Sequence, residues 1–288
     1  MQSGGFLQDL VQRAWRHRDQ CNISVRRNRK DRMKPMRWEK ELQVARSAAM
    51  HAGDLARGYQ GRELKPESKP DLSPVTVADR ECEKLIAAEI LAAFPDDGLL
   101  GEEGADRPSN NGRKWILDPI DGTRDFVRGL PFWAVLIGLE VDGEVVAGVT
   151  NMAAQNKMYH AVKGKGAFCN DQPISVSGIH SPSDALACVN GINNVTEYPW
   201  ANKLLPWLDQ FWAVRSLGGC MDAMMLASGH AELWLEAHAK AWDLAPLKLI
   251  LEESGARFCN FDGGSSIYGG NGMAFVPGLE NAVKDLLG

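Results

Sequence analysis

The stretch that decides the fold reads Trp115-Ile-Leu-Asp-Pro-Ile-Asp-Gly-Thr-Arg-Asp-Phe126. It begins as an apolar strand and then presents two carboxylates, Asp118 and Asp121, three residues apart. Pro119 has no N–H to donate to a sheet ladder, so the sequence predicts that the strand ends there. Both carboxylates are therefore expected at the carboxyl end of the strand, where the chain turns.

The residues after the second carboxylate indicate a site for an anion. Gly122 allows close approach of the backbone, and Thr123 is predicted to begin a helix, whose first N–H groups carry a partial positive charge. Two carboxylates beside an anion would repel it unless a cation lay between them. Mg²⁺ takes oxygen ligands, including those of substrate phosphates, so the segment predicts a magnesium and phosphate cradle. An Asp-x-x-Asp-Gly segment seen alone is more often a surface turn with a capping Asp.

Hydrophobic periodicity predicts alternating blocks of helix and strand around this segment. Asp142-Gly143 has the composition of a hairpin turn, and Lys163-Gly-Lys-Gly166 is also predicted to be a turn, since no Ser or Thr follows to complete a phosphate loop. Such alternation favours stacked layers of helix and sheet. The predicted helices cover 38–57, 78–94, 223–231 and 244–255, and the predicted strands cover 115–117, 133–141, 145–151 and 157–161.

Length and composition describe an ordinary globular protein. The chain has 288 residues, 44% of them hydrophobic and 24% charged, which argues against coiled coil and long disordered regions. The longest apolar stretch, Phe132 to Leu139, is far shorter than the ~20 residues that cross a bilayer, so no membrane span is expected. The six cysteines are isolated from one another, which favours a reducing compartment and predicts a cytoplasmic location.

Charge is distributed unevenly along the chain. Residues 1–40 carry eleven Lys and Arg against four acids, whereas the remainder is acidic. An acidic body argues against a nucleic-acid surface on the main domain, because phosphate backbones require a basic face. Residues 1–37 are predicted to be a basic extension, either a disordered solvated tail, an organelle-targeting segment or the product of an upstream start site.

Two further acidic segments follow apolar runs. Gly101-Glu-Glu-Gly104 comes after a probable strand, and Trp242-Asp243 stands at a predicted helix start. Taken singly, each is more often a solvated turn or a helix cap. Together with the Asp-Pro-Ile-Asp-Gly-Thr segment, however, the chain resembles the inositol monophosphatase-like Mg²⁺-dependent phosphatases. The segments that carry the resemblance are, in chain order, Lys69-Pro-Asp-Leu-Ser-Pro-Val-Thr-Val-Ala-Asp79, Gly101-Glu-Glu103, Trp115 to Thr123 and Trp242-Asp-Leu-Ala245.

The resemblance implies a fold, a metal site and a set of catalytic groups. The implied fold is a layered α-β-α-β-α sandwich, commonly a homodimer, spanning residues 38–288 with a metal-binding half over 38–176 and a second half over 177–288. Two or three Mg²⁺ ions are implied, which activate the attacking water and stabilise the leaving group. The implied residues are Glu102, Asp118, Asp121, Asp243 and the carbonyl of Ile120 for metal, Gly122 and Thr123 for phosphate, and Asp79, Thr123, Glu102 and Thr76 for catalysis.

Alternative hydrolase chemistries have little support in the sequence. Within residues 38–288 no Cys has the C-x5-R spacing of cysteine phosphatases, and the chain has no Gly-x-Ser-x-Gly elbow of serine hydrolases. The resemblance implies that the substrate is a small phosphorylated metabolite. The resemblance places Glu236, seven residues before Asp243, against the alcohol part of that substrate, and Arg215 is predicted as a second substrate contact.

One further segment bears on which substrate the resemblance favours. Thr123-Arg-Asp-Phe-Val-Arg-Gly-Leu-Pro-Phe-Trp133 looks most like the histidinol-phosphatase branch of the family. One departure bears on this: the branch often has an acid after the Gly of an Arg-x-x-Gly segment, where this chain has Gly219, and Asp222 lies three residues on. Inositol 1-phosphate, a 3'(2'),5'-bisphosphate nucleotide and a catalytically decayed scaffold of the same fold remain as alternatives.

Overall fold

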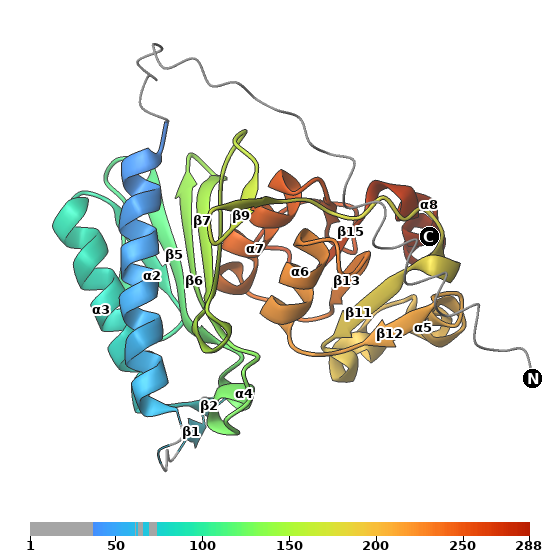
Figure 1. Cartoon of the computed structure of the whole chain (residues 1–288), viewed down its shortest axis with the longest axis horizontal. Helices are drawn as coiled ribbons and strands as arrows, with labels where there is room; N and C mark the ends of the chain where they lie inside the picture. Colours follow the sequence, from blue (N-terminus) through green and yellow to red (C-terminus); the bar gives the residue numbers. More distant parts are fainter. Residues whose placement is uncertain (1–36, 61, 63–65, 69–73) are drawn as a thin grey trace, which may run out of the picture. The chain divides into compact units, whose positions relative to one another are not determined.

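The computed structural model describes residues 37–60, 62, 66–68 and 74–288, and residues 38–288 form one unit. The basic extension predicted over residues 1–37 lies outside the described residues, apart from Arg37. The unit contains an eight-stranded sheet and a five-stranded sheet, with helices outside and between them (Figure 1). A two-stranded ladder of β1 (Glu67–Ser68) and β2 (Pro74–Val75) lies beside them.

The eight-stranded sheet contains the strand of the Trp115–Phe126 segment. Its strand order is β10-β9-β8-β7-β6-β5-β3-β4, and its pairs are antiparallel except for β3 with β5. Because β3 and β5 run in parallel, their carboxyl ends meet at the same edge of the sheet. The strands are β3 (Gly98–Gly101), β4 (Asp106–Arg107), β5 (Arg113–Asp121), β6 (Ala134–Val141), β7 (Glu144–Met152), β8 (Lys157–Val162), β9 (Ala167–Cys169) and β10 (Gln172–Ile174).

The five-stranded sheet is built from the second half of the chain. Its order is β12-β11-β13-β15-β14, with β11 parallel to both β12 and β13. Strand β13 ends at Glu236, and the loop that follows it leads to the next helix. The strands are β11 (Leu186–Asn190), β12 (Ala213–Arg215), β13 (Leu233–Glu236), β14 (Arg257–Cys259) and β15 (Gly272–Phe275).

Helices complete the layers. Helices α2 (Glu39–Tyr59) and α3 (Val77–Ala93) cover one face of the eight-stranded sheet, and α6 (Gly219–Ala227) and α7 (Ala241–Glu253) lie between the two sheets (Figure 1). Helices α5 (Ala201–Leu208) and α8 (Glu280–Leu287) lie beyond the five-stranded sheet. This is the predicted α-β-α-β-α order. The short helices are α4 (Thr123–Val127), η1 (Ala153–Gln155), η2 (Pro182–Asp184), η3 (Ile192–Glu197) and η4 (Pro277–Leu279).

Side-chain size explains two of these layers. The buried face of α2 is mainly alanine, which lets the helix lie close to the sheet: Ala45, Ala48, Ala49, Ala52 and Ala56. Helix α7 is instead apolar on nearly all sides, since it packs against strands of both sheets. A helix enclosed in this way has little freedom to move, which matters because Asp243 lies in its first turn.

Most predicted elements have boundaries within two or three residues of the observed ones, but two predictions were wrong. The helix expected over 223–231 begins at Gly219 and ends at Ala227, because Gly218 forms its N-cap at φ 125° and the chain turns at Gly229. The strand expected to end before Pro119 runs on to Asp121. The physical reason is an irregularity in its pairing, described below.

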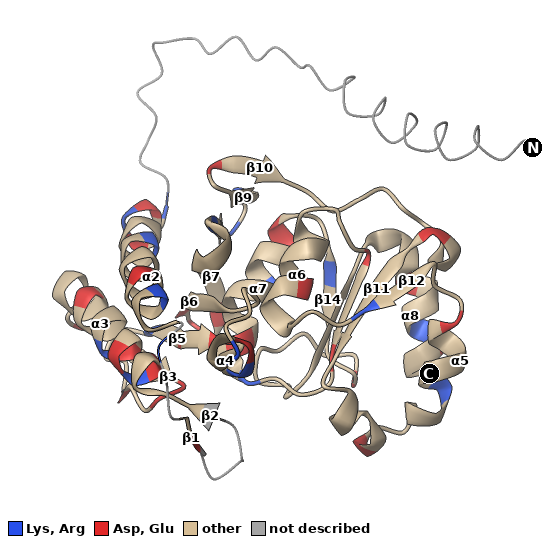
Figure 2. Cartoon of the chain, turned by 60° about the horizontal axis from the view of Figure 1, so that its bottom comes forward, with Lys and Arg blue, Asp and Glu red and all other residues tan. Residues whose placement is uncertain are grey.

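The described part of the chain has no helix long and apolar enough to span a membrane. Figure 2 shows Lys and Arg interspersed with Asp and Glu over the described elements, rather than gathered on one of them.

Candidate active site

An extra residue in β5 brings the first two carboxylates to one side. Asp118 pairs with Leu136 and Asp121 with Ala134, so three steps along β5 oppose two steps along β6. Residues three apart in a regular strand point to opposite faces, whereas an inserted residue reverses the alternation. Pro119, which donates no hydrogen bond, lies within this irregularity. It therefore bends the strand rather than ending it.

Glu102 joins them from the neighbouring strand. Gly101 is the last residue of β3 and pairs with Leu117, and the N–H of Glu102 donates to the carbonyl of Leu117 at 3.1 Å. The turn after it is held by Glu83, whose carboxylate accepts from the N–H groups of Glu103 and Ala105, both at 2.8 Å. Glu102 is thus fixed beside Asp118 at the shared edge of the sheet.

Asp243 arrives from the other direction, on α7. It is the third residue of the helix, and its Oδ2 accepts from the N–H of Lys240 at 2.7 Å, which caps the helix. Helix α7 lies directly on β6: a Cβ placed on Gly138 would be 2.9 Å from the Cβ of Ala245. Only glycine at position 138 permits this approach, which carries the first turn of α7 to the edge of the sheet.

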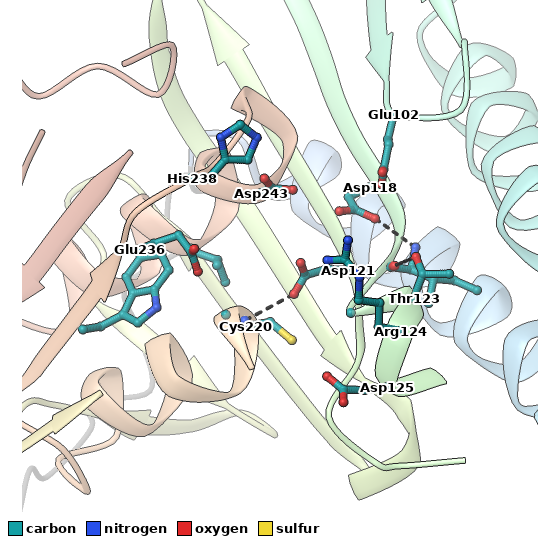
Figure 3. A pocket seen from close by; sticks show the side chains of 15 residues that line it. Glu102, Asp118, Asp121, Thr123, Arg124, Asp125, Cys220, Glu236, His238 and Asp243 are labelled. Carbon is teal, nitrogen blue, oxygen red and sulfur yellow. Dashed lines mark hydrogen bonds between the residues drawn. The ribbon is translucent and has the colours of Figure 1, made fainter. Parts of the chain in front are cut away.

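These carboxylates form a cluster suited to a divalent cation. One oxygen from each of Asp118, Asp121 and Asp243 lies within 4.8 Å of the others. Each carboxylate also binds a backbone N–H with one oxygen: Asp118 that of Ile120 at 3.0 Å, and Asp121 that of Cys220 at 3.2 Å. Figure 3 shows the three side chains gathered between Glu102 and Glu236.

Electrostatics favours a cation in this cluster. Burial, followed by the charges of Glu102, Asp121 and Asp243, raises the pKa of Asp118 well above its usual value. Burial and the charge of Asp121 raise the pKa of Asp243 to about 8. Burial also raises the pKa of Asp121. Such groups gain stability when a divalent ion lies among them, and hard oxygen donors suit Mg²⁺. The residues present therefore fit the predicted metal.

Thr123 lies beside the cluster and is held from behind by a buried aspartate. Its Oγ1 is 3.2 Å from Oδ1 of Asp79 and 3.0 Å from the carbonyl oxygen of Ile120. The other oxygen of Asp79 accepts from the N–H of Thr76 at 2.8 Å and from its hydroxyl at 2.6 Å. Burial raises the pKa of Asp79, against the effect of these hydrogen bonds.

Gly122 sets the path of the backbone between metal cluster and Thr123. It adopts φ 84°, and a Cβ there would lie 2.6 Å from the carbonyl oxygen of Phe132. A side chain is excluded on both counts, by the left-handed conformation and by the contact. Helix α4 begins at the next residue, so the N–H groups of Thr123 and Arg124 precede the first hydrogen bonds of the helix, which the N–H groups of Asp125 and Phe126 donate to the carbonyl of Gly122.

A cavity of about 260 Å³ joins these groups (Figure 3). Among the sequence-predicted residues it is lined by Glu102, Asp118, Ile120, Asp121, Gly122, Thr123, Glu236 and Asp243. Burial, together with the charges of Asp243 and Asp121, raises the pKa of Glu236 well above its usual value. The cavity is also lined by residues that sequence reasoning missed, namely Arg124, Asp125, Gly219, Cys220, Trp234, His238 and Leu247.

Three predicted residues lie outside the cavity lining. Thr76 and Asp79 reach it only through Thr123. Arg215 is not brought to the site: it is exposed at the end of β12, and its guanidinium donates to the carbonyl of Val214 at 2.8 Å. Asp222 is buried away from the cavity, where it accepts from the side chain of Asn190 at 2.8 Å. It cannot supply the acid that is missing at Gly219.

Most of the lining residues that the sequence did not predict lie where the chain reverses direction. Arg124 and Asp125 belong to the five-residue helix α4, and Cys220 stands at the start of α6. Asp125 lies in the quoted decisive segment, so an acid two residues after Thr123 was a signal that could have been read. His238 follows Glu236 by two residues, and residues at this spacing in an extended segment point to the same side. This spacing was a second signal that the sequence contained.

Comparison with known proteins places the chain in a family. A model described as the inositol monophosphatase family matches residues 37–284. The chain belongs to the inositol monophosphatase family. It is a phosphoric monoester hydrolase with the layered α/β fold of that family. A histidinol-phosphatase of Chlorobaculum parvum is 41% identical over 81% of this chain and 90% of the relative. One of Mycobacterium tuberculosis is 35% identical over 81% and 92%.

Other members of the family carry other names. An inositol-1-monophosphatase of Mesorhizobium japonicum is 34% identical over 85% of this chain and 94% of the relative. Among solved structures, an IMPase of Thermotoga maritima superposes with a TM-score of 0.78 at 27% identity, covering 86% of this chain and 96% of that one. The family therefore fixes the fold and the class of reaction, and not the substrate.

Proposed function

We propose that this phosphatase hydrolyses L-histidinol phosphate to L-histidinol and phosphate with bound Mg²⁺. The observation that carries the proposal is the charge of its cavity: beyond the metal cluster, the cavity presents the further carboxylate of Glu236. An acidic wall suits a cationic amino alcohol and suits an uncharged polyol less well. The two relatives named histidinol-phosphatase above support the same substrate.

The metal is held in this proposal by carboxylate and carbonyl oxygens already positioned by the backbone. Asp118, Asp121 and Asp243 would supply the oxygens that lie within 4.8 Å of one another. Glu102 and the carbonyl of Ile120 would complete the set. Bound Mg²⁺ supplies Lewis acidity, which lowers the pKa of water and neutralises phosphoryl oxygens as charge develops. The backbone contacts fix each carboxylate before the ion binds, so little reorganisation is required.

Thr123 and Asp79 orient the attacking water. The hydroxyl of Thr123 donates to Asp79, which leaves the lone pairs of Oγ1 directed toward the cavity, where they accept a proton of the water. Asp79 is itself held by Thr76, through one N–H and one O–H. Thr76 is therefore a positioning residue. The proton of the water passes toward Thr123 as the hydroxyl gives its own to Asp79.

Phosphate and alcohol occupy different parts of the cavity. Backbone N–H groups at Gly122 and Thr123 would bind the phosphoryl oxygens, and Glu236 at the end of β13 would bind the ammonium group of the alcohol. Arg215 has no place in this arrangement, because it is exposed on β12 and does not line the cavity.

Phosphate release tests the proposal. The full chain is assayed with Mg²⁺ on L-histidinol phosphate, inositol 1-phosphate and adenosine 3',5'-bisphosphate side by side. The proposal expects kcat/KM to be highest for L-histidinol phosphate and activity to disappear with a chelator. A higher kcat/KM for either of the other two would refute this substrate.

Three further expectations from the sequence accompany the proposal. The phosphatase domain is expected to begin at residue 38, so removal of residues 1–37 should leave turnover unchanged. A homodimer is expected, and light scattering in solution measures its mass. A cytoplasmic location is expected, and fractionation of cells that produce the chain tests it.

A further inference from the structure

Asp125 is an acid of the cavity to which neither the resemblance nor the reaction assigns a role. It is the third residue of α4 and lines the same cavity as the metal cluster. Its backbone is fixed at both ends, since its N–H donates to the carbonyl of Gly122 and its carbonyl accepts from the N–H of Leu130, each at 2.9 Å. The side chain is therefore presented to the cavity from a rigid turn.

Its carboxylate makes no hydrogen bond or ion pair with any residue that the structure describes, although the charges of Arg128 and Arg124 act on it. Burial raises the pKa of Asp125, and this outweighs the opposing charges of Arg128 and Arg124. A half-buried carboxylate without a hydrogen bond is costly, and a cationic ligand would offset that cost.

The position of Asp125 relative to Glu236 is set by the first residues of α6. A Cβ on Gly218 would lie 3.5 Å from Oδ2 of Asp125, and a Cβ on Gly219 would lie 3.1 Å from Oε2 of Glu236. The two carboxylates thus flank two consecutive glycines, and Figure 3 shows them on either side of Cys220. Neither glycine carries a side chain that would fill the space between the acids.

Neither Glu236 nor Asp125 belongs to the metal cluster. Asp118, Asp121 and Asp243 each place one oxygen within 4.8 Å of the others, and each accepts from a backbone N–H group. Asp125 is not part of that cluster, and a molecule whose phosphate occupies the metal end would direct its alcohol part toward Glu236 and Asp125. An uncharged polyol gains little from two carboxylates there, whereas a diamine or an amino-imidazole can pair with both.

We propose that Asp125 is a specificity-determining residue, which pairs with a cationic nitrogen of the alcohol part of the substrate. The inference rests on the proposed function and deepens it, because it divides the recognition of a doubly basic amino alcohol between Glu236 and Asp125. Asp125 takes no part in the chemistry, so it acts on KM for cationic substrates and not on turnover of neutral ones.

The test compares Asp125→Asn with wild type on two substrates, L-histidinol phosphate and inositol 1-phosphate, at saturating Mg²⁺. The expected result is a KM about tenfold higher for L-histidinol phosphate with kcat within about twofold, and a change in KM for inositol 1-phosphate of no more than about twofold. Asp125→Glu, which keeps the charge, should restore part of the preference. Asp184→Asn removes an acid from the exposed turn η2 and serves as the matched control.

Two results overturn the assignment. A ratio of kcat/KM between the two substrates that is unchanged in Asp125→Asn shows that the carboxylate does not discriminate. An equal loss on both substrates shows a structural role.

A separate measurement distinguishes failure of the role assigned to Asp125 from failure of the proposed function. L-histidinol is tested as an inhibitor of the hydrolysis of whichever substrate the wild type prefers. If the wild type prefers inositol 1-phosphate, the proposed function fails, yet weaker inhibition of Asp125→Asn by L-histidinol still supports a cation contact at Asp125. An inhibition constant unchanged by the substitution contradicts it in either case.

Discussion

The two ends of the cavity are built differently. At the metal end, Asp118, Asp121 and Asp243 each bind a backbone N–H, and they stand on a central strand and a helix enclosed between sheets. At the other end, Asp125 stands on a five-residue helix and its carboxylate binds no described residue. The difference teaches that the framework fixes the groups for chemistry, whereas recognition depends on side chains that the ligand itself must satisfy.

The largest effect is expected at the metal end. Asp118→Asn removes a buried ligand, and kcat/KM should fall about 10³-fold on every substrate, equivalent to ~4 kcal/mol in the transition state. Phosphate release measures it, with Asp184→Asn as the control. Because the charge of Asp118 is buried beside like charges, the variant should unfold at an equal or higher temperature than wild type in a chelator. A loss confined to one substrate would place Asp118 in recognition instead.

A smaller loss of activity is expected at Asp79, which contacts Thr123 beside the cluster. Asp79→Asn replaces a carboxylate that accepts from Thr76 and Thr123 by an amide with a single acceptor, so kcat should fall about 10²-fold. The Mg²⁺ concentration for half-maximal activity should stay within about twofold, since Asp79 is not among the clustered oxygens. Should Mg²⁺ dependence shift more than kcat, Asp79 would be a ligand rather than an orienting group.

Packing outside the cavity lining should also affect the metal cluster. Gly138→Ala places a Cβ 2.9 Å from that of Ala245 and pushes α7, with Asp243, away from the sheet. Overpacking of this kind costs about 1–3 kcal/mol, so the Mg²⁺ requirement should rise about tenfold. The preference among substrates should not change. Gly58→Ala is the matched control, because a Cβ there meets nothing within 4 Å. If both variants changed the Mg²⁺ requirement equally, the packing of α7 against β6 would not determine metal binding.

The pH dependence of stability gives the smallest effect. The pKa of Asp243 is raised from 3.8 to about 8 in the folded chain, so the folded state binds this proton more tightly than the unfolded one. The metal-free protein should therefore lose stability as pH rises from about 4 to 8. Bound Mg²⁺ takes the place of this proton, so it should raise the melting temperature more at pH 8 than at pH 5. Each kcal/mol of difference in the free energy of stabilisation corresponds to about 2–4 °C in melting temperature. An Mg²⁺ effect that is equal at both pH values would contradict this coupling.

The sequence predicted which acids lie together, because these residues stand in segments with local physical signatures. Apolar strands ended in acids, and a capped helix began near Trp242. It did not predict the bulge that turns Asp118 and Asp121 to one side, since pairing with β6 decides that register. Pro119 donates no hydrogen bond and lies within this irregularity, and the strand continues past it to Asp121.

Substrate contacts were less accessible from sequence. Arg215 matched a segment of the family, yet its side chain is exposed on β12, since orientation at a strand end depends on tertiary packing. Asp125 was present in the most closely read segment, but only the approach of Gly218 from α6 shows that it faces the cavity. Residues that meet through loops of different halves leave no local pattern along the chain.

The central claim is that acids from β3, β5 and α7 meet around shared divalent ions to hydrolyse a phosphate ester. Calorimetric titration of metal-free protein with Mg²⁺, wild type against Asp118→Asn, tests it most directly, because it needs no knowledge of the substrate. The account predicts saturable binding to the wild type and binding at least about tenfold weaker in the variant. Equal Mg²⁺ affinity in both proteins would contradict it.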